Sequence, residues 1–176
     1  MLFRSYKQFF PTHCNRNDYI FEDAKTYGKE GYVDITASSY PYFAEYEVKP
    51  STSIKELLNA GVPIEHITMT SDGNGSLPHF DENGELVRLE MGQPKSIFTE
   101  MSEAVTIDKL PLEVALKTVT SNVAKILKLR NKGNIRVGAD ADIVLIERDF
   151  TITEVISRSR VMLSNKKLLV KGTYEY

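Results

Sequence analysis

The stretch ITMTSDGNGS, residues 67–76, joins a short β-strand pattern to a polar, glycine-rich loop. Residues 67–71 are predicted to form a strand, and Asp72 follows directly at its carboxyl end. The glycines of the loop allow backbone amides to come close to a ligand. In a parallel α/β barrel, side chains at the carboxyl ends of the strands point into the active site. The stretch therefore predicts a strand of a parallel sheet and makes Asp72 a candidate functional residue.

The sequence before this stretch alternates between strand and helix patterns. Apolar spacing predicts a helix over residues 20–30, followed by a strand over residues 32–36. A second helix is predicted over residues 52–60, where a threonine or serine can cap the first turn and Gly61 ends the helix. A longer helix is predicted over residues 111–127. Strands that alternate with helices indicate βαβ units and a parallel sheet.

The character of the sequence changes after residue 130. Short strands separated by turn residues are predicted over residues 134–137, 143–146, 151–157, 161–163 and 168–171. A small sheet of this kind needs a partner sheet or must pack on the rest of the chain. The sequence therefore predicts two domains, residues 1–131 and 132–176.

Composition and charge exclude several classes of partner. The chain has 176 residues, a formal net charge of -2 and 41% hydrophobic residues, which is ordinary for a globular protein. The sequence shows no cluster of basic residues of the kind that binds nucleic acid. No apolar run has the ~20 residues of a membrane helix. A single cysteine allows no intramolecular disulfide. We therefore expect a cytoplasmic protein that binds neither nucleic acid nor membrane.

Polar residues lie where the predicted strands end. They are His13, Asp72 and either Asp34 or Thr36. An imidazole and a carboxylate on neighbouring strand ends suit zinc ligation or an acid–base pair. Simpler interpretations stay open on the residues alone: a structural histidine, a turn aspartate and, for Arg16, a surface ion pair.

Other residues that could carry chemistry have simpler explanations. Cys14 is expected to pack in the core, since no triad spacing surrounds it. His66 and His79 are expected to be solvated in loops. Asp140 and Asp142 are expected to be turn residues at the start of a strand.

Taken together, the motifs resemble those of isoaspartyl (β-aspartyl) dipeptidases of the amidohydrolase superfamily. The resemblance rests on PTHCNRN at residues 11–17, DIT at 34–36 and SDGNGS at 71–76, in that order. GADADIV at residues 138–144 resembles the return from barrel to β-sandwich in the wider superfamily. The implied fold is α/β: part of a (β/α)8 TIM barrel of the metallo-dependent hydrolase type, followed by short antiparallel strands of a small β-sandwich.

The resemblance also implies roles for four residues. His13 and Asp72 match metal ligands of a site that holds two zinc ions. Asp72 also matches the catalytic residue that takes a proton from the attacking water and delivers it to the leaving amine. Arg16 and Ser76 match residues that bind the substrate, a small dipeptide linked through the aspartate side chain. The resemblance also implies that the full-length protein forms a homo-oligomer.

Part of the site that the resemblance implies is missing. The His-x-His pair, the bridging lysine and a further histidine of such enzymes have no counterpart, and a complete barrel needs roughly 250 residues. We therefore expect a fragment of strands six to eight that binds zinc weakly and is inactive alone. The alternatives are a non-catalytic remnant, a subunit that complements a chain with the missing ligands, and a metal-free module that binds carboxylates.

Overall fold

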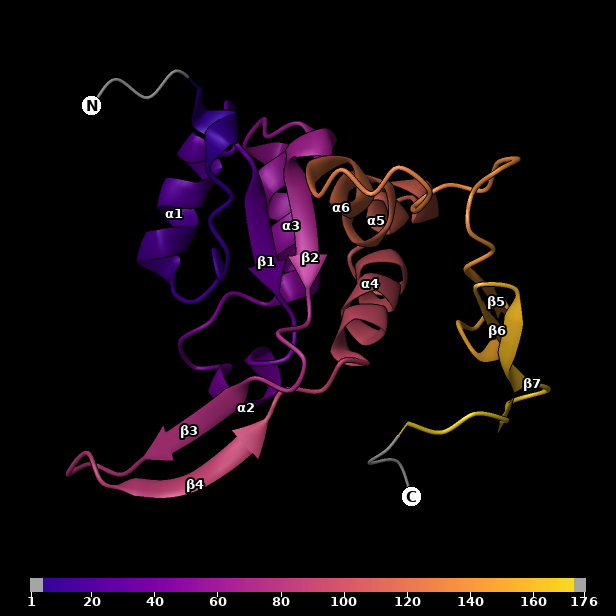
Figure 1. Cartoon of the computed structure of the whole chain (residues 1–176). Helices are drawn as coiled ribbons and strands as arrows, with labels where there is room; N and C mark the ends of the chain where they lie inside the picture. The colour runs from indigo at the N-terminus through magenta and orange to yellow at the C-terminus, as the bar shows by residue number, and fades with distance from the viewer. Residues whose placement is uncertain (1–4, 173–176) are drawn as a thin grey trace. The chain divides into compact units, whose positions relative to one another are not determined.

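A parallel set of extended segments organises the first part of the chain in the computed structural model, which describes residues 5–172. Strand β1 (Val33–Thr36) pairs in parallel with β2 (Ile67–Thr70) (Figure 1). On the other side of β1, the amide of Asp34 donates to the carbonyl of Pro11 at 3.1 Å, and the amide of Cys14 donates to the carbonyl of Asp34 at 3.0 Å. Residues 11–14 therefore run beside β1 with one residue more than a regular ladder holds.

The two faces of the β1–β2 pair differ because successive side chains point to opposite sides of a strand. One face is apolar and fully buried, and it consists of Val33, Ile35, Ile67 and Met69. The other face is polar, and it consists of Asp34, Thr36, Thr68 and Thr70. The chain therefore buries one side of the sheet as core and keeps the other side for polar groups.

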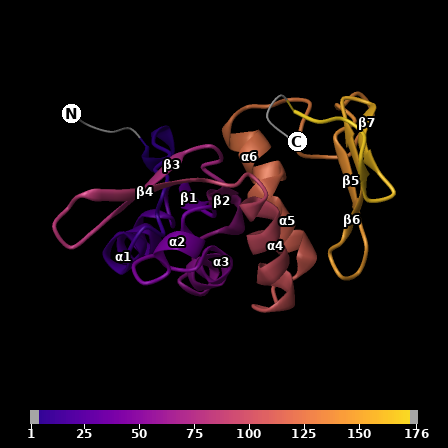
Figure 2. The ribbon, with the colours of Figure 1, turned by 90° about the horizontal axis from the view of Figure 1, so that it is seen from below.

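Helices supply the rest of this core. The helices before β3 are η1 (Tyr6–Gln8), α1 (Asp18–Tyr27), α2 (Tyr40–Phe43), α3 (Pro50–Asn59) and η2 (Ile64–His66). Helix α3 packs across both strands and buries Ile54 and Leu57 completely (Figure 2). Burial of one such side chain contributes about 1.5–3 kcal/mol. Helix α4 (Ser96–Thr106) packs between α3 and α5 (Leu112–Val119), and α5 contacts β2.

A β-hairpin follows the loop after β2. Strands β3 (Ser76–Phe80) and β4 (Leu86–Met91) pair antiparallel, and the hairpin extends away from β1 and β2 (Figure 1). Asp81 makes the turn, because its Oδ1 accepts from the amides of Asn83 and Glu85, each at 2.9 Å. The sequence patterns did not predict the two strands beside this turn.

The helix predicted over residues 111–127 is in fact two helices, α5 and α6 (Ser121–Ile126). They are separated at Thr120, whose φ of -127° and ψ of -90° are not helical. A run of three β-branched residues, 118–120, weakens the helix at this point. Asn122 then donates to the carbonyls of Ile64 and Ile67 at 2.7 and 2.8 Å, which fixes the start of α6.

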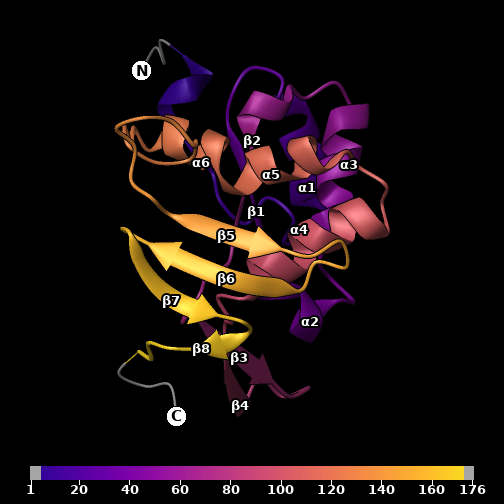
Figure 3. The same cartoon turned by 90° about the vertical axis from the view of Figure 1, so that its right-hand side faces the viewer.

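The chain divides into two compact units, residues 1–123 and 124–176. In the second unit, strands β5 (Ile143–Ile146), β6 (Ile152–Ser157), β7 (Arg160–Ser164) and β8 (Lys167–Leu168) form one antiparallel sheet in sequence order (Figure 3). The turn between β6 and β7 has positive φ at Arg158 and Ser159, a conformation that favours glycine.

One strand predicted for this unit is wrong. Residues 134–137 have no regular secondary structure, and the side chains of Ile135 and Val137 are almost fully exposed. Gly133 and Gly138 both have positive φ, so the backbone turns on each side of this short run. The general expectation is confirmed: α/β structure with parallel strands, then short antiparallel strands. The described residues form no closed barrel, and none of their helices is long and apolar enough to span a membrane.

Candidate functional site

His13 lies at the carboxyl end of the segment beside β1. Its φ of +58° is unusual for a residue other than glycine, and it coincides with the extra residue in the pairing to β1. The ring Nδ1 is 2.8 Å from the hydroxyl of Thr36 on β1 and 3.3 Å from Nη2 of Arg16. When Nδ1 carries the proton and donates it to Thr36, the lone pair of Nε2 is free to bind a metal ion.

Asn15 holds this segment against the end of β1. Its Oδ1 accepts from the amide of Thr36 at 2.8 Å, and its Nδ2 donates to the carbonyls of Thr36 and Val48. The side chain is almost completely buried, so these bonds are shielded from water. Two residues later, Asn17 caps α1 by accepting from the amide of Ile20. The motif at residues 13–17 therefore combines two site residues with the two asparagines that hold them in place.

Arg16 is partly exposed and faces a buried acid. Its Nη1 lies 3.3 Å from Oε1 of Glu47, whose side chain is 1% exposed. The other carboxylate oxygen of Glu47 accepts from the hydroxyl of Ser39 at 2.7 Å. Burial raises the pKa of Glu47, while the Ser39 hydrogen bond and the charge of Arg16 oppose the rise. The guanidinium thus lies between Glu47 and His13 with part of its surface open to solvent.

Asp72 follows β2 and has a left-handed backbone with φ of +51°. The carbonyl of Asp72 accepts from the amide of Gly75 at 2.9 Å, and two further backbone bonds join the loop to Gly92 at the end of β4. A Cβ at Gly92 would lie 2.5 Å from that same carbonyl, so only glycine fits there. Ser76 begins β3 directly after the loop and is exposed.

Asp34 occupies the polar face of β1 between these groups. Its two oxygens accept from the hydroxyls of Thr68 and Thr70, each at 2.6 Å. Burial raises the pKa of Asp34; the two hydroxyls and the charge of His13 lower it, and the charge of Asp72 raises it further. The carboxyl of Asp34 therefore interacts electrostatically with both candidate metal ligands, His13 and Asp72.

The residues predicted from the sequence lie on neighbouring segments. His13 and Arg16 follow the extended segment, Asp72 follows β2, and Ser76 follows the Asp72 loop. In residues 5–172, however, no group of three or more histidine, cysteine, aspartate or glutamate side chains could hold a metal ion. His13 and Asp72 are suitable donors for zinc, but zinc usually takes four ligands. The described residues alone do not complete a zinc site.

Other residues have structural roles. Cys14 is buried, and its thiol donates to the carbonyl of Pro11, as expected for a core residue. Asp140 and Asp142 pair with Lys132, and Asp142 also accepts from the amide of Arg158, so both are turn residues. The prediction that His66 and His79 are solvated is wrong, because both side chains pack against other residues.

His66 is 8% exposed and its Nδ1 contacts the carbonyl of Gly28 at 2.8 Å. His79 is half-buried and stacks on the ring of Phe43 at 4.9 Å. Both rings lie against aromatic side chains, and the sequence pattern around them gave no sign of these long-range contacts.

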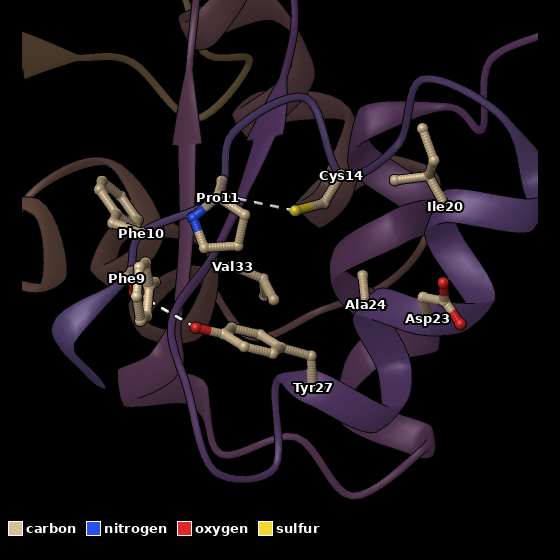
Figure 4. Close-up of a pocket in the computed structure, with 9 residues that line it drawn as sticks. All are labelled: Phe9, Phe10, Pro11, Cys14, Ile20, Asp23, Ala24, Tyr27 and Val33. Atoms are coloured by element: carbon tan, nitrogen blue, oxygen red, sulfur yellow. Dashed lines mark hydrogen bonds between the residues drawn. The ribbon is translucent and has the colours of Figure 1, made fainter. Parts of the chain in front are cut away.

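A cavity of about 450 Å³ lies on the opposite, apolar side of β1. Figure 4 shows Val33, Ala24 and Tyr27 facing it, together with the aromatic residues before Pro11. Asp23 is the one charged residue in its lining. The cavity is therefore separate from the polar groups around His13 and Asp72.

Comparison with known proteins agrees with this arrangement. A family model described as "Amidohydrolase family" matches residues 36–161. The chain belongs to the amidohydrolase family. Its fold resembles the β-aspartyl dipeptidase of Fervidobacterium islandicum AW-1, solved in complex with a β-Asp-Leu dipeptide, with a TM-score of 0.79 and 32% identity over 93% of this chain and 42% of that one.

Other enzymes are similar to this chain over shorter regions. N-acetylglucosamine-6-phosphate deacetylase of Lysinibacillus sphaericus is 32% identical over 94 residues, which are 51% of this chain and 24% of that protein. The corresponding enzyme of Pasteurella multocida shares the fold with a TM-score of 0.55 at 18% identity, over 76% of this chain and 37% of that one. The chain thus spans about a quarter to two-fifths of the length of these relatives.

Proposed function

We propose that this chain contributes His13, Arg16, Asp72 and Ser76 to the active site of a zinc-dependent β-aspartyl dipeptidase. The observation that carries the proposal is their common position after neighbouring parallel segments of one sheet. In a barrel of this kind, the active site is built at the carboxyl ends of the strands. Arg16 gives this site a cation suited to a substrate carboxylate.

A dipeptide substrate is supported over an acetylated sugar phosphate. The likeness to the β-aspartyl dipeptidase covers 93% of the chain at a TM-score of 0.79, against 76% and 0.55 for a deacetylase. Arg16 alone does not discriminate, because a guanidinium binds phosphate as well as carboxylate. The choice between these substrates therefore requires a direct binding comparison.

Each of the four residues has a chemical task in this proposal. His13 and Asp72 would hold zinc, which when bound activates water and polarises a carbonyl. The carboxylate of Asp72 receives the proton of the attacking water and passes it to the leaving amine. The guanidinium of Arg16 binds a carboxylate of the substrate, and the hydroxyl of Ser76 orients the dipeptide by a hydrogen bond.

The number of metal ligands limits what the chain does alone. Two donors do not hold two zinc ions, so further ligands must come from outside the described residues. We infer that the 176-residue chain does not turn over substrate by itself. Catalysis would need the missing ligands to be supplied, either by a further segment of a longer protein or by another polypeptide.

The binding test is an NMR titration of the isotope-labelled 176-residue chain with added zinc. β-Aspartyl-leucine should shift the resonances of residues 13–16 and 72–76. α-Aspartyl-leucine is the matched control, since it has the same composition with the ordinary peptide link. Arg16→Lys and Ser76→Ala should each weaken the response. A response to N-acetylglucosamine-6-phosphate alone would overturn the proposed substrate class.

A second test addresses the incomplete metal site. After dialysis against zinc, we expect less than one tightly bound zinc ion per chain and no measurable hydrolysis of β-aspartyl-leucine. Two bound zinc ions with turnover would show that the chain completes its own site, for example by self-association, and would contradict this part of the proposal.

A further inference from the structure

Glu47 is a buried acid that none of the roles above uses. It follows α2, and its amide donates to the carbonyl of Phe43 at 3.0 Å, which fixes the backbone next to the site. The side chain is 1% exposed, and a carboxylate without a charged partner at such a position is strongly destabilising. Its partners are the hydroxyl of Ser39 and the guanidinium of Arg16.

The two oxygens of Glu47 have different tasks. Oε2 is anchored by Ser39 at 2.7 Å, which fixes the plane of the carboxylate. Oε1 has no aligned hydrogen bond, but it lies 3.3 Å from Nη1 of Arg16. The interaction with Arg16 is therefore an ion pair between a buried, hydrogen-bonded carboxylate and a partly exposed side chain.

Arg16 needs such an anchor if it is to recognise a carboxylate. Its side chain is 36% exposed, and a free arginine carries about 2 kcal/mol of rotamer entropy. Nη2 lies 3.3 Å from Nδ1 of His13, but that nitrogen cannot accept from it in the tautomer whose Nε2 is free to bind metal, so the ion pair with Glu47 is the restraint that remains. With Nη1 held by the buried carboxylate of Glu47, the remaining N–H groups keep a more defined direction, which reduces the entropy lost when a ligand binds.

We propose that Glu47 is a positioning residue that holds the Arg16 guanidinium in the orientation in which it receives the substrate carboxylate. The proposal rests on the role of Arg16 in the proposed function. Glu47 itself does not touch the substrate. Ser39 contributes to this positioning, because its hydroxyl donates a hydrogen bond to the carboxylate of Glu47.

The test is made on the 176-residue chain with two measurements. The first is the NMR signal of the Arg16 side chain, assigned by its loss in Arg16→Lys. The wild-type guanidinium should rotate slowly and give separate Nη1 and Nη2 signals, and Glu47→Gln should average them. The second is the titration with β-aspartyl-leucine, in which Glu47→Gln should weaken binding about tenfold through lost preorganisation.

Further variants separate positioning from folding. Ser39→Ala should loosen the Arg16 signal while keeping the negative charge, and Glu47→Asp should restore part of the binding lost in Glu47→Gln. If Glu47→Gln does not fold, these two variants carry the test. Glu45→Gln is the matched control, since Glu45 is exposed on the same loop and its change should leave both measurements as in wild type.

The outcomes distinguish this inference from the proposed function. If Arg16→Lys leaves the binding of β-aspartyl-leucine unchanged, the substrate role of Arg16 is wrong, and the positioning proposal falls with it. If Arg16→Lys weakens binding but Glu47→Gln and Ser39→Ala leave both measurements unchanged, the proposed function stands and the positioning role is wrong.

Discussion

The side chain of Asn15 forms two hydrogen bonds with the backbone of Thr36 at the end of β1, as a neighbouring strand would. Its Oδ1 accepts from the amide of Thr36 at 2.8 Å, and its Nδ2 donates to the carbonyl of Thr36 at 3.1 Å. The same Nδ2 also donates to the carbonyl of Val48 at 3.0 Å. Thr36 in turn contacts the ring of His13. The buried side-chain amide of Asn15 thus joins the segment that carries His13 and Arg16 to β1, whose Thr36 orients the ring of His13.

We expect Asn15→Ala to lower the free energy of unfolding by about 3 kcal/mol, because a buried polar group left without a partner costs about 1–3 kcal/mol and three groups lose theirs. Urea unfolding measures the change. Asn17→Ala is the matched control: it removes one exposed capping bond and should cost about 1 kcal/mol. Equal losses of unfolding free energy in the two variants would show that the buried hydrogen bonds of Asn15 contribute no more than a single exposed capping bond.

Much of the fold could be predicted because periodicity and turn residues are local. The strand and helix patterns between residues 20 and 71 correspond to α1, β1, α3 and β2 within a few residues. The split at Thr120 could not be predicted, since it depends on Asn122 binding carbonyls more than fifty residues away. The hairpin strands were missed because exposed residues on both faces of β4 give no clear alternation.

The candidate site also contains residues that the sequence predicted and residues that only the structure identified. His13, Arg16, Asp72 and Ser76 were found through their motifs, and their roles remain predictions. Glu47 and Ser39 had no signal, because a single acid and a single serine in a polar stretch have no pattern. Their importance comes from burial and from contacts between segments, which only the three-dimensional structure provides.

Cys14 should be chemically inert in the folded chain. Burial is the main cause that raises the pKa of its thiol from 9.0 to about 11. At pH 8 the reactive thiolate is then about a hundredfold rarer than in the unfolded chain, since each pKa unit is a factor of ten. The rate of alkylation by iodoacetamide, compared with and without urea, measures this. Similar rates in the two states would show that the thiol is accessible.

Asp34 should make stability depend on pH in a defined direction. Its pKa is raised in the folded state, first by burial, so the folded chain holds this proton more tightly than the unfolded chain. The stability that results is fully present below the unfolded value, about pH 4, and is lost as the pH rises through the folded value. Relative to Asp34→Asn, the wild type should therefore lose stability as the pH rises across this window.

Urea unfolding of the wild type and the variants from about pH 2 to pH 8 measures this difference. Asp81→Asn is a control of opposite sign, because backbone amides lower the pKa of Asp81. The stability that Asp81 contributes is present above its unfolded pKa and is lost as the pH falls through the folded value. If the difference between wild type and Asp34→Asn does not change with pH, Asp34 is not the group that titrates.

Gly92→Ala should displace the Asp72 loop. The new Cβ would lie 2.5 Å from the carbonyl of Asp72 and 2.6 Å from Oγ of Ser38, and a backbone atom cannot rotate away. Overpacking of this kind typically costs about 1–3 kcal/mol. Thermal unfolding should show the loss, and NMR shifts should change at residues 72–76. Gln93→Ala, at an exposed neighbouring position, is the control and should change neither. Unchanged loop resonances in Gly92→Ala would mean that β4 moves instead, so that the position of Asp72 does not depend on this contact.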